Sequence, residues 1–187
     1  MDKAKLIIKI ITNLLLVCYP FIIYLSFKYQ YINLAVWVLM IFFVLRFISL
    51  PNLFSSMRWL AKTLAIMGIL LAVSSWLFAK YQLLLYYPVM VNMIFLLLFS
   101  YSLSQPQTII EKFARMQHSD LPIKAVQYTR KVTICWCLFF VINGSIALTT
   151  CLINDMYWWT IYNGLISYLL MAILMGVEWL IRQKLQH

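Results

Sequence analysis

The chain has 187 residues, of which 65% are hydrophobic and 11% charged, whereas a soluble domain is about 45–50% apolar and about 25% charged. A soluble fold would need nearly the whole chain in its core and would have no surface left, so we exclude that class. Apolar runs of about 20 residues, the length that an α-helix needs to cross a bilayer, recur from end to end. We therefore predict an all-α, polytopic integral membrane protein with a single transmembrane domain over residues 1–187.

The formal net charge of +10 does not indicate a nucleic-acid partner. The basic residues lie at the ends of apolar runs, where they encode orientation in a membrane, and they do not form one soluble face. We expect membrane lipids, and no nucleic acid, among the partners. The sequence leaves the oligomeric state open.

The four cysteines do not form a metal-binding pattern. Cys18, Cys135, Cys137 and Cys151 all lie inside apolar runs, and the Cys135-x-Cys137 pair would point to different sides of a helix. A zinc site needs two such pairs or added histidines. We predict no metal and no cofactor.

Six transmembrane helices are predicted in chain order. Their approximate bounds are residues 6–27, 31–48, 60–79, 83–103, 132–153 and 157–181. The run that follows Lys9 is too long for a cleavable signal, so we expect it to stay as the first helix. Pro20 lies within this helix and Pro88 in the first turns of the fourth, where each removes one backbone hydrogen bond. A turn-rich connection at 49–59 joins the second and third helices.

An even number of helices places both termini on the same side of the membrane. Thirteen of the fifteen Lys and Arg residues then fall on that side, and only Lys28 and Lys80 fall on the other. Positive residues are enriched on the cytoplasmic side of membrane proteins. The sequence therefore predicts an N-in, C-in topology.

A polar loop at 104–131 divides the chain, and within it we predict a short amphipathic helix. Ile109, Ile110, Phe113 and Met116 would share one face, while Thr108 and Glu111 fit a capping box. Such a helix would lie along the cytoplasmic lipid surface; the alternative is a plain re-entry loop. Candidate residues for docking a partner or a lipid head group are Glu111, Lys112, Arg115, Lys124, Arg130 and Lys131.

Polar residues inside the last two predicted helices have two interpretations. They could bond between helices, with Gly144 and Gly164 allowing close approach, or they could line a cleft for a lipid head group or another ligand. The candidate cleft residues are Trp136, Asn143, Tyr162, Asn163, Ser167 and Glu178. Arg182 follows Glu178 by four residues, which is the spacing of a local ion pair.

No standard catalytic motif is present in the sequence. A catalytic or proton-coupled carboxylate in the membrane would need a second acid at similar depth, and no other predicted helix supplies one. We therefore expect a protein that is not an enzyme.

The segments PQTIIEKFARM, LPIKAVQYTRKVTICWCLFFVINGSIAL and WWTIYNGLISYLLMAILMGVEWLIR resemble a family of small predicted inner-membrane proteins. That family is encoded in bacterial aryl polyene gene clusters, beside fatty-acid-synthase-like genes. Trp136, Phe139, Phe140 and Asn143 are also similar in order to the intracellular septation protein A family. The resemblance covers about residues 106–182 and implies a multi-pass protein of the bacterial inner membrane, in a cell-envelope setting.

These observations lead us to expect a non-catalytic accessory protein of a cell-envelope pathway. It would assist assembly or export of an aryl polyene or lipid-like product by docking cytoplasmic partners at its basic loop. An acyl carrier protein, an acyltransferase or envelope-synthesis proteins are the expected partners, because an acidic carrier complements a basic face. The alternatives are a transporter of a lipid or lipid-linked product and a protein of septation or envelope maintenance.

Overall fold

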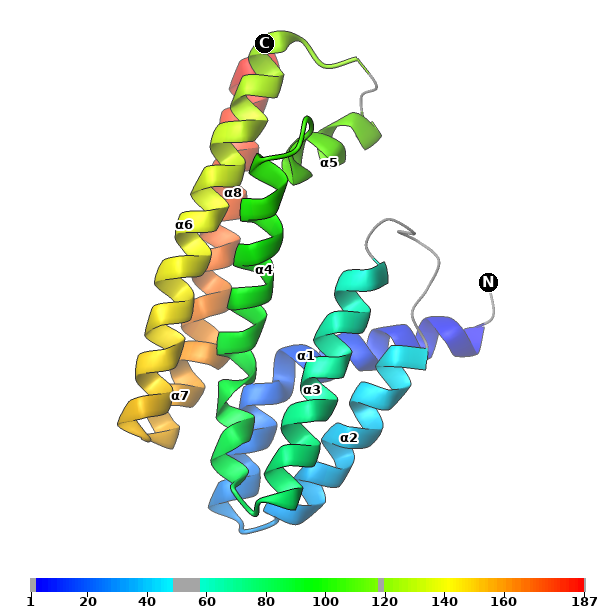
Figure 1. The fold of residues 1–187 in the computed structure, drawn as a ribbon, viewed down its shortest axis with the longest axis vertical. Helices are drawn as coiled ribbons and strands as arrows, with labels where there is room; N and C mark the ends of the chain where they lie inside the picture. The colour runs from blue at the N-terminus through cyan, green and yellow to red at the C-terminus, as the bar shows by residue number, and fades with distance from the viewer. Residues whose placement is uncertain (1–2, 49–57, 118–119, 187) are drawn as a thin grey trace. The chain divides into compact units, whose positions relative to one another are not determined.

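The computed structural model describes residues 3–48, 58–117 and 120–186, and each element in these ranges is a helix (Figure 1). Most of the predicted connection at 49–59 therefore lies outside the described residues. The elements are α1 (Lys3–Lys28), α2 (Ile32–Ile48), α3 (Arg58–Leu77), the 3₁₀ helix η2 (Tyr81–Tyr86), α4 (Tyr87–Leu103), α5 (Ile109–Gln117), α6 (Ile123–Ile153), α7 (Met156–Ile161), the π-helix η3 (Tyr162–Ile166) and α8 (Ser167–Gln186).

Three helical segments are long and apolar enough to cross a membrane. They are Tyr81–Leu103 with 23 residues, Ile123–Ile153 with 31 and Met156–Gln183 with 28. Shorter apolar stretches lie at Val17–Lys28, Ile32–Leu45 and Lys62–Leu77. A span needs about 20 residues at ~1.5 Å per residue. The predicted class, an all-α membrane protein, is therefore confirmed for the described residues.

Two of the predicted helices differ in the structure, one in its start and one in its regularity. The helix predicted from residue 132 begins at Ile123, directly after Pro122, so the polar loop is shorter than 104–131. The added turns are rich in Lys, Arg and Gln, which hides them from hydropathy although these residues favour helix. The last predicted helix is not uniform, because a π-helical turn separates α7 from α8.

The described chain divides into two compact units. The first contains residues 1–90 and 147–165, and the second contains residues 91–146 and 166–187. The first unit therefore holds α1, α2, α3, η2 and α7, whereas the second holds most of α4, α5, most of α6, and α8.

In the first unit, Pro88 explains why a 3₁₀ turn precedes α4. Proline lacks an N–H, so the carbonyl of Leu84 loses its usual helical donor. The Tyr19 hydroxyl donates to this oxygen at 2.6 Å. The next carbonyl, that of Leu85, accepts from the Trp159 indole N–H at 3.1 Å. The Leu84 oxygen also accepts from the backbone N–H of Tyr87. The 3₁₀ turn and these side chains together satisfy the backbone beside the proline, as a membrane interior requires.

Close helix packing in the first unit depends on two glycines. Gly68 of α3 faces the buried ring of Phe43 on α2, and a Cβ at this glycine would overlap the ring. Gly164 lies against α1, where a Cβ would come within 3.0 Å of the Phe21 ring. The predicted close approach at Gly164 is therefore confirmed.

In the second unit, a buried polar cluster joins three helices. The Asn143 side-chain amide of α6 donates to Asn92 Oδ1 of α4 at 2.9 Å and to Ser167 Oγ of α8 at 3.0 Å. Gly144 allows this approach, because a Cβ there would lie 3.1 Å from the Asn92 Cβ. The cluster confirms bonding between helices as the role of Asn143 and Ser167.

Candidate functional site

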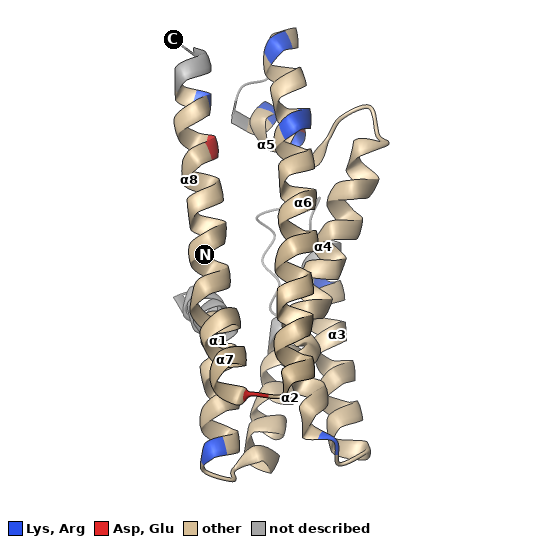
Figure 2. Ribbon diagram, turned by 90° about the vertical axis from the view of Figure 1, so that its left-hand side faces the viewer, with Lys and Arg blue, Asp and Glu red and all other residues tan. Residues whose placement is uncertain are grey.

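One end of the second unit carries many basic residues, whose positions on the ribbon are blue around α5, the first turns of α6 and the end of α8 in Figure 2. We call this group the basic end. It consists of Lys112 and Arg115 on α5, Lys124, Arg130 and Lys131 on α6, and Arg182 on α8.

The described acids of this region are Glu111, Asp120 and Glu178, three carboxylates against the six cations of the basic end. Within the described residues the salt bridges are Arg115 to Glu111 and Arg182 to Glu178. Lys112, Lys124 and Lys131 are exposed and are not part of either. These three ammonium groups therefore give the end a positive surface.

Arg130 has a local role at the basic end. Its guanidinium donates to the carbonyl oxygen of Leu103 at 2.9 Å, and Leu103 is the last residue of α4. A cation at a helix C-terminus also interacts favourably with the helix dipole. Arg130 thus ties α6 to the end of α4.

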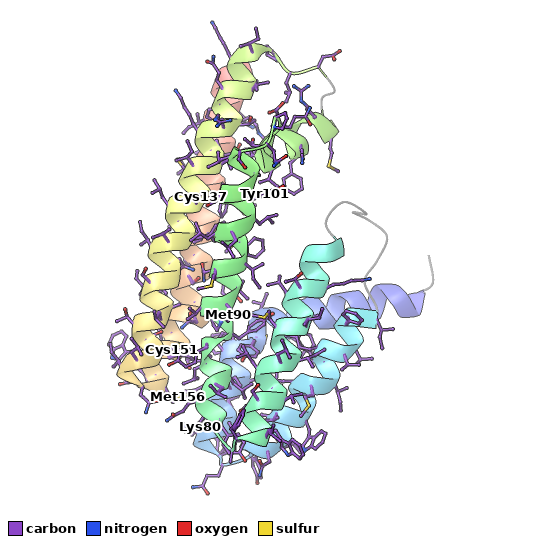
Figure 3. The ribbon with its side chains drawn as sticks, viewed as in Figure 1. Lys80, Met90, Tyr101, Cys137, Cys151 and Met156 are labelled. Carbon is purple, nitrogen blue, oxygen red and sulfur yellow. The ribbon has the colours of Figure 1, made fainter. Side chains whose placement is uncertain are left out.

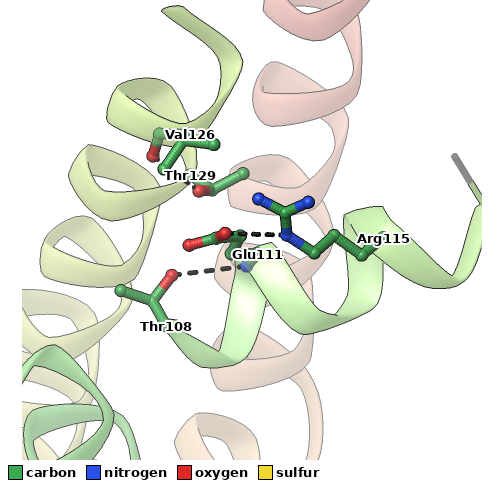
Figure 4. Close-up of polar contacts among 5 residues, drawn as sticks. All are labelled: Thr108, Glu111, Arg115, Val126 and Thr129. Atoms are coloured by element: carbon green, nitrogen blue, oxygen red, sulfur yellow. Dashed lines mark hydrogen bonds and ion pairs between the residues drawn. The ribbon is translucent and has the colours of Figure 1, made fainter. Parts of the chain in front are cut away.

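Glu111 lies inside the protein, so it is not a surface residue for docking (Figure 4). It is 3% exposed, and its carboxylate accepts from Arg115 Nε at 2.8 Å. Its backbone N–H donates to the Thr108 hydroxyl at 3.3 Å, which is the cap predicted from the sequence. The Glu111 carboxylate, however, pairs with Arg115, one turn further along α5.

The amphipathic helix predicted in the loop is α5. A hydrogen bond joins its first residue to α4. The N–H of Ile109 donates to the Ser102 hydroxyl at 3.3 Å, and Ile109 is buried. Phe113 and Met116 are 38% and 64% exposed. The apolar residues of α5 therefore divide between the protein interior and the outside.

An apolar pocket of about 380 Å³ lies between α4, α5, α6 and α8 of the second unit. Four aromatic residues form much of its wall: Phe95 and Phe99 on α4, and Trp136 and Phe140 on α6. The Phe95 and Phe140 rings stack with centroids 5.3 Å apart, and Phe99 meets Phe140 edge-on at the same separation. Such a wall is apolar, rigid and suited to an apolar ligand.

One part of the pocket lining is polar. It contains Tyr128 and Thr129 from the start of α6 and Glu178 and Arg182 from the end of α8. The Tyr128 hydroxyl donates to the carbonyl oxygen of Glu178 at 3.3 Å. The lining is thus apolar for most of its extent, with polar groups converging at one place.

The residues predicted for one polar cleft occupy different sites. Trp136 and Glu178 line the apolar pocket, whereas Asn143 and Ser167 belong to the buried cluster with Asn92. Tyr162 and Asn163 are buried in the first unit, where the Asn163 amide donates to the Thr150 hydroxyl at 3.2 Å. These contacts belong to two units, and a single polar cleft formed by all six residues stays a prediction.

Sequence reasoning missed Phe95, Phe99, Met171 and Met175 as lining residues of the pocket. In the sequence, Phe and Met residues of α4 and α8 cannot be told apart from residues that face the lipid. A spacing of four places Phe95 with Phe99, and Met171 with Met175, on one face of each helix. This spacing was the only available signal.

The cysteines form separate contacts. Cys137 accepts from the Ser100 hydroxyl at 3.6 Å, and Cys151 donates to the Leu85 carbonyl at 3.2 Å; both cysteines are labelled in Figure 3. Among the described residues, the structure shows no group of His, Cys, Asp and Glu that could hold a metal ion.

Comparison with protein-family models, curated proteins and solved structures finds no match for this chain.

Proposed function

We propose that this chain is a non-catalytic accessory protein of the bacterial inner membrane that docks acidic cytoplasmic proteins at its basic end. In this proposal the six apolar helical stretches all cross the membrane, and both termini lie in the cytoplasm. The docked partner is an acyl carrier protein or a protein that works with one. The product whose assembly or export it assists is an aryl polyene or another lipid-like molecule.

The observation that supports docking is the exposure of Lys112, Lys124 and Lys131, which take part in neither of the two salt bridges. Glu111 is buried against Arg115, and Glu178 lies 3.9 Å from Arg182 Nε. The three lysines are therefore available for an external anion. Complementary charge of this kind accelerates association and selects the partner.

Charge reversal of the three lysines is the test. The triple variant Lys112→Glu, Lys124→Glu, Lys131→Glu should bind an acyl carrier protein more than tenfold more weakly than the unchanged protein, because attraction becomes repulsion. Binding should also weaken as salt is raised, since exposed charges are screened within ~10 Å at 0.1 M ionic strength. The measurement is surface plasmon resonance with the full chain in lipid nanodiscs.

The matched control reverses Lys28 and Lys80 of the first unit, two basic residues that are exposed and predicted to lie on the opposite side of the membrane. This double variant should bind the carrier like the unchanged protein. Equal binding by the triple variant and the unchanged protein would refute docking at the basic end. Arg115 is left unchanged because its replacement would leave the Glu111 carboxylate buried without a partner.

A further inference from the structure

The lining of the apolar pocket changes from apolar to charged along its length. On α8 the lining residues are Met171, Met175, Glu178 and Arg182. Spacings of four, three and four place these side chains in one stripe of the helix. The stripe runs from thioethers to an ion pair near the end of α8.

The lining residues of α6 also change from apolar to polar, but toward the start of the helix, whereas on α8 they do so toward its end. Tyr128 lies nearest the start of the helix, and Val132, Trp136 and Phe140 follow it at intervals of four residues. The bond from the Tyr128 hydroxyl to the Glu178 carbonyl brings the two polar ends together. The pocket therefore has one polar end, which we call its mouth, and an apolar remainder.

The buried polar cluster marks the inner end of this lining. Ser167 lies one turn before Met171 on α8, and Asn143 lies about one turn beyond Phe140 on α6. From Arg182 to Met171, the two ends of the lining on α8, the helix rises by ~16 Å at ~1.5 Å per residue. Half of a bilayer's hydrocarbon core is ~15 Å thick, and this half is the space that one acyl chain fills. The lining from the charged end to Met171 therefore has the length of a single chain.

The volume also favours a single chain. At about 380 Å³, the pocket lies near the low end of the ~300–1,000 Å³ of small-molecule sites. Ile110, Phe113 and Ala114 of α5 add a fourth wall. A second chain would need more room than this volume provides.

Arg182 provides a binding group for an anion at the mouth. Its Nε lies 3.9 Å from the Glu178 carboxylate, beyond the ~2.7–3.2 Å of a hydrogen bond. The Arg182 side chain is 36% exposed, and a guanidinium can bind a carboxylate or phosphate through two parallel hydrogen bonds. The exposed lysines of the basic end add a positive potential that favours an anionic head group.

We propose that the apolar pocket binds a single-chain anionic amphiphile, with its carboxylate or phosphate head at Arg182 and its chain along Trp136 and Phe140 toward Met171. This site is separate from docking at the basic end: the ligand contacts Arg182 and the pocket walls, whereas a docked protein contacts Lys112, Lys124 and Lys131.

Photocrosslinking in native membranes tests the proposal with a palmitic acid that carries a diazirine in the middle of its chain. We expect saturable labelling of the full-length chain, mapped by mass spectrometry to peptides that contain Phe95, Trp136 or Met171. Excess palmitate and excess hexadecyl phosphate should both prevent labelling, and their relative potency identifies the preferred head. Hexadecanol and phosphatidic acid should compete at least tenfold more weakly, since the first lacks the charge and the second has two chains.

Two variants test the pocket from its two ends. Arg182→Gln should reduce the affinity for the photoprobe at least tenfold because it removes the charge-assisted bonds. Ala114→Trp should reduce labelling by filling the space beside α5. Lys80→Gln, which removes a cation from the first unit, should label like the unchanged protein. Non-saturable labelling, equal competition by hexadecanol, or labelling insensitive to both pocket variants would overturn the proposal.

Discussion

Glu111 is the charged residue that most constrains the second unit. Among the described residues it is the one charged side chain in the buried class, and Arg115 is its partner. Removing one partner of a buried pair leaves an uncompensated charge and costs ~3–5 kcal/mol, whereas removing both costs far less. Both residues belong to α5, so burial of the Glu111 carboxylate, and with it the packing of α5, depends on Arg115. From sequence alone Glu111 looked like a surface acid, because burial against α6 depends on tertiary packing.

A double-mutant cycle measures this dependence. Arg115→Ala should speed amide hydrogen exchange across α5 about a hundredfold, since ~3 kcal/mol of local stability corresponds to that factor. Adding Glu111→Gln should restore exchange to within about tenfold of the unchanged protein. Equal effects of the single and double variants would show that the pair does not hold α5.

The Asn143 amide is a second residue whose role is measurable. Asn143→Ala removes its bonds to Asn92 and Ser167, and hydrogen bonds between membrane helices contribute ~0.6 kcal/mol on average and up to ~1.7 kcal/mol. We expect a loss of about 1–2 kcal/mol in unfolding free energy, measured by chemical denaturation in mixed micelles. Asn163→Ala, in the first unit, should leave amide exchange of α8 unchanged.

At the scale of elements, the sequence predicts local features better than their partners. The amphipathic spacing at 108–117 correctly predicts α5 and its Thr108 cap, because both depend on neighbours within one or two turns. The start of α6 at Ile123 was missed, since polar residues conceal a helix from hydropathy. The 3₁₀ turn before α4 follows from Pro88, but its donors Tyr19 and Trp159 come from distant parts of the chain.

Two glycines of the described helices make a matched pair for testing helix packing. Gly68→Ala inserts a methyl group against the buried Phe43 ring and should destabilise the protein by ~1–3 kcal/mol through overpacking. Gly176 of α8 has open space around its Cβ position, so Gly176→Ala should be neutral or stabilise by up to ~1 kcal/mol through helix propensity. Thermal unfolding in detergent compares the two. A lower melting temperature for the Gly176 variant alone would contradict this account of packing.

At the scale of the whole molecule, the sequence reveals the class and the charge distribution but not the pocket. Composition predicts the all-α membrane protein, and the order of basic residues predicts the orientation. The pocket requires α4, α5, α6 and α8 to meet at a particular register, and no periodicity specifies which helices are neighbours. Trp136 and Glu178 were candidates for a ligand site, but their polar companions in the prediction belong to other contacts.

The account depends most on the cytoplasmic location of the basic end, and cysteine labelling tests it most directly. In a chain whose Cys18, Cys135, Cys137 and Cys151 are replaced by serine or alanine, single cysteines are introduced as Lys124→Cys and Lys80→Cys. A membrane-impermeant maleimide added to spheroplasts should label the Lys80 variant at once and the Lys124 variant only after the membrane is opened. Labelling of the Lys124 variant in intact spheroplasts would place the basic end outside the cell and contradict docking of cytoplasmic partners.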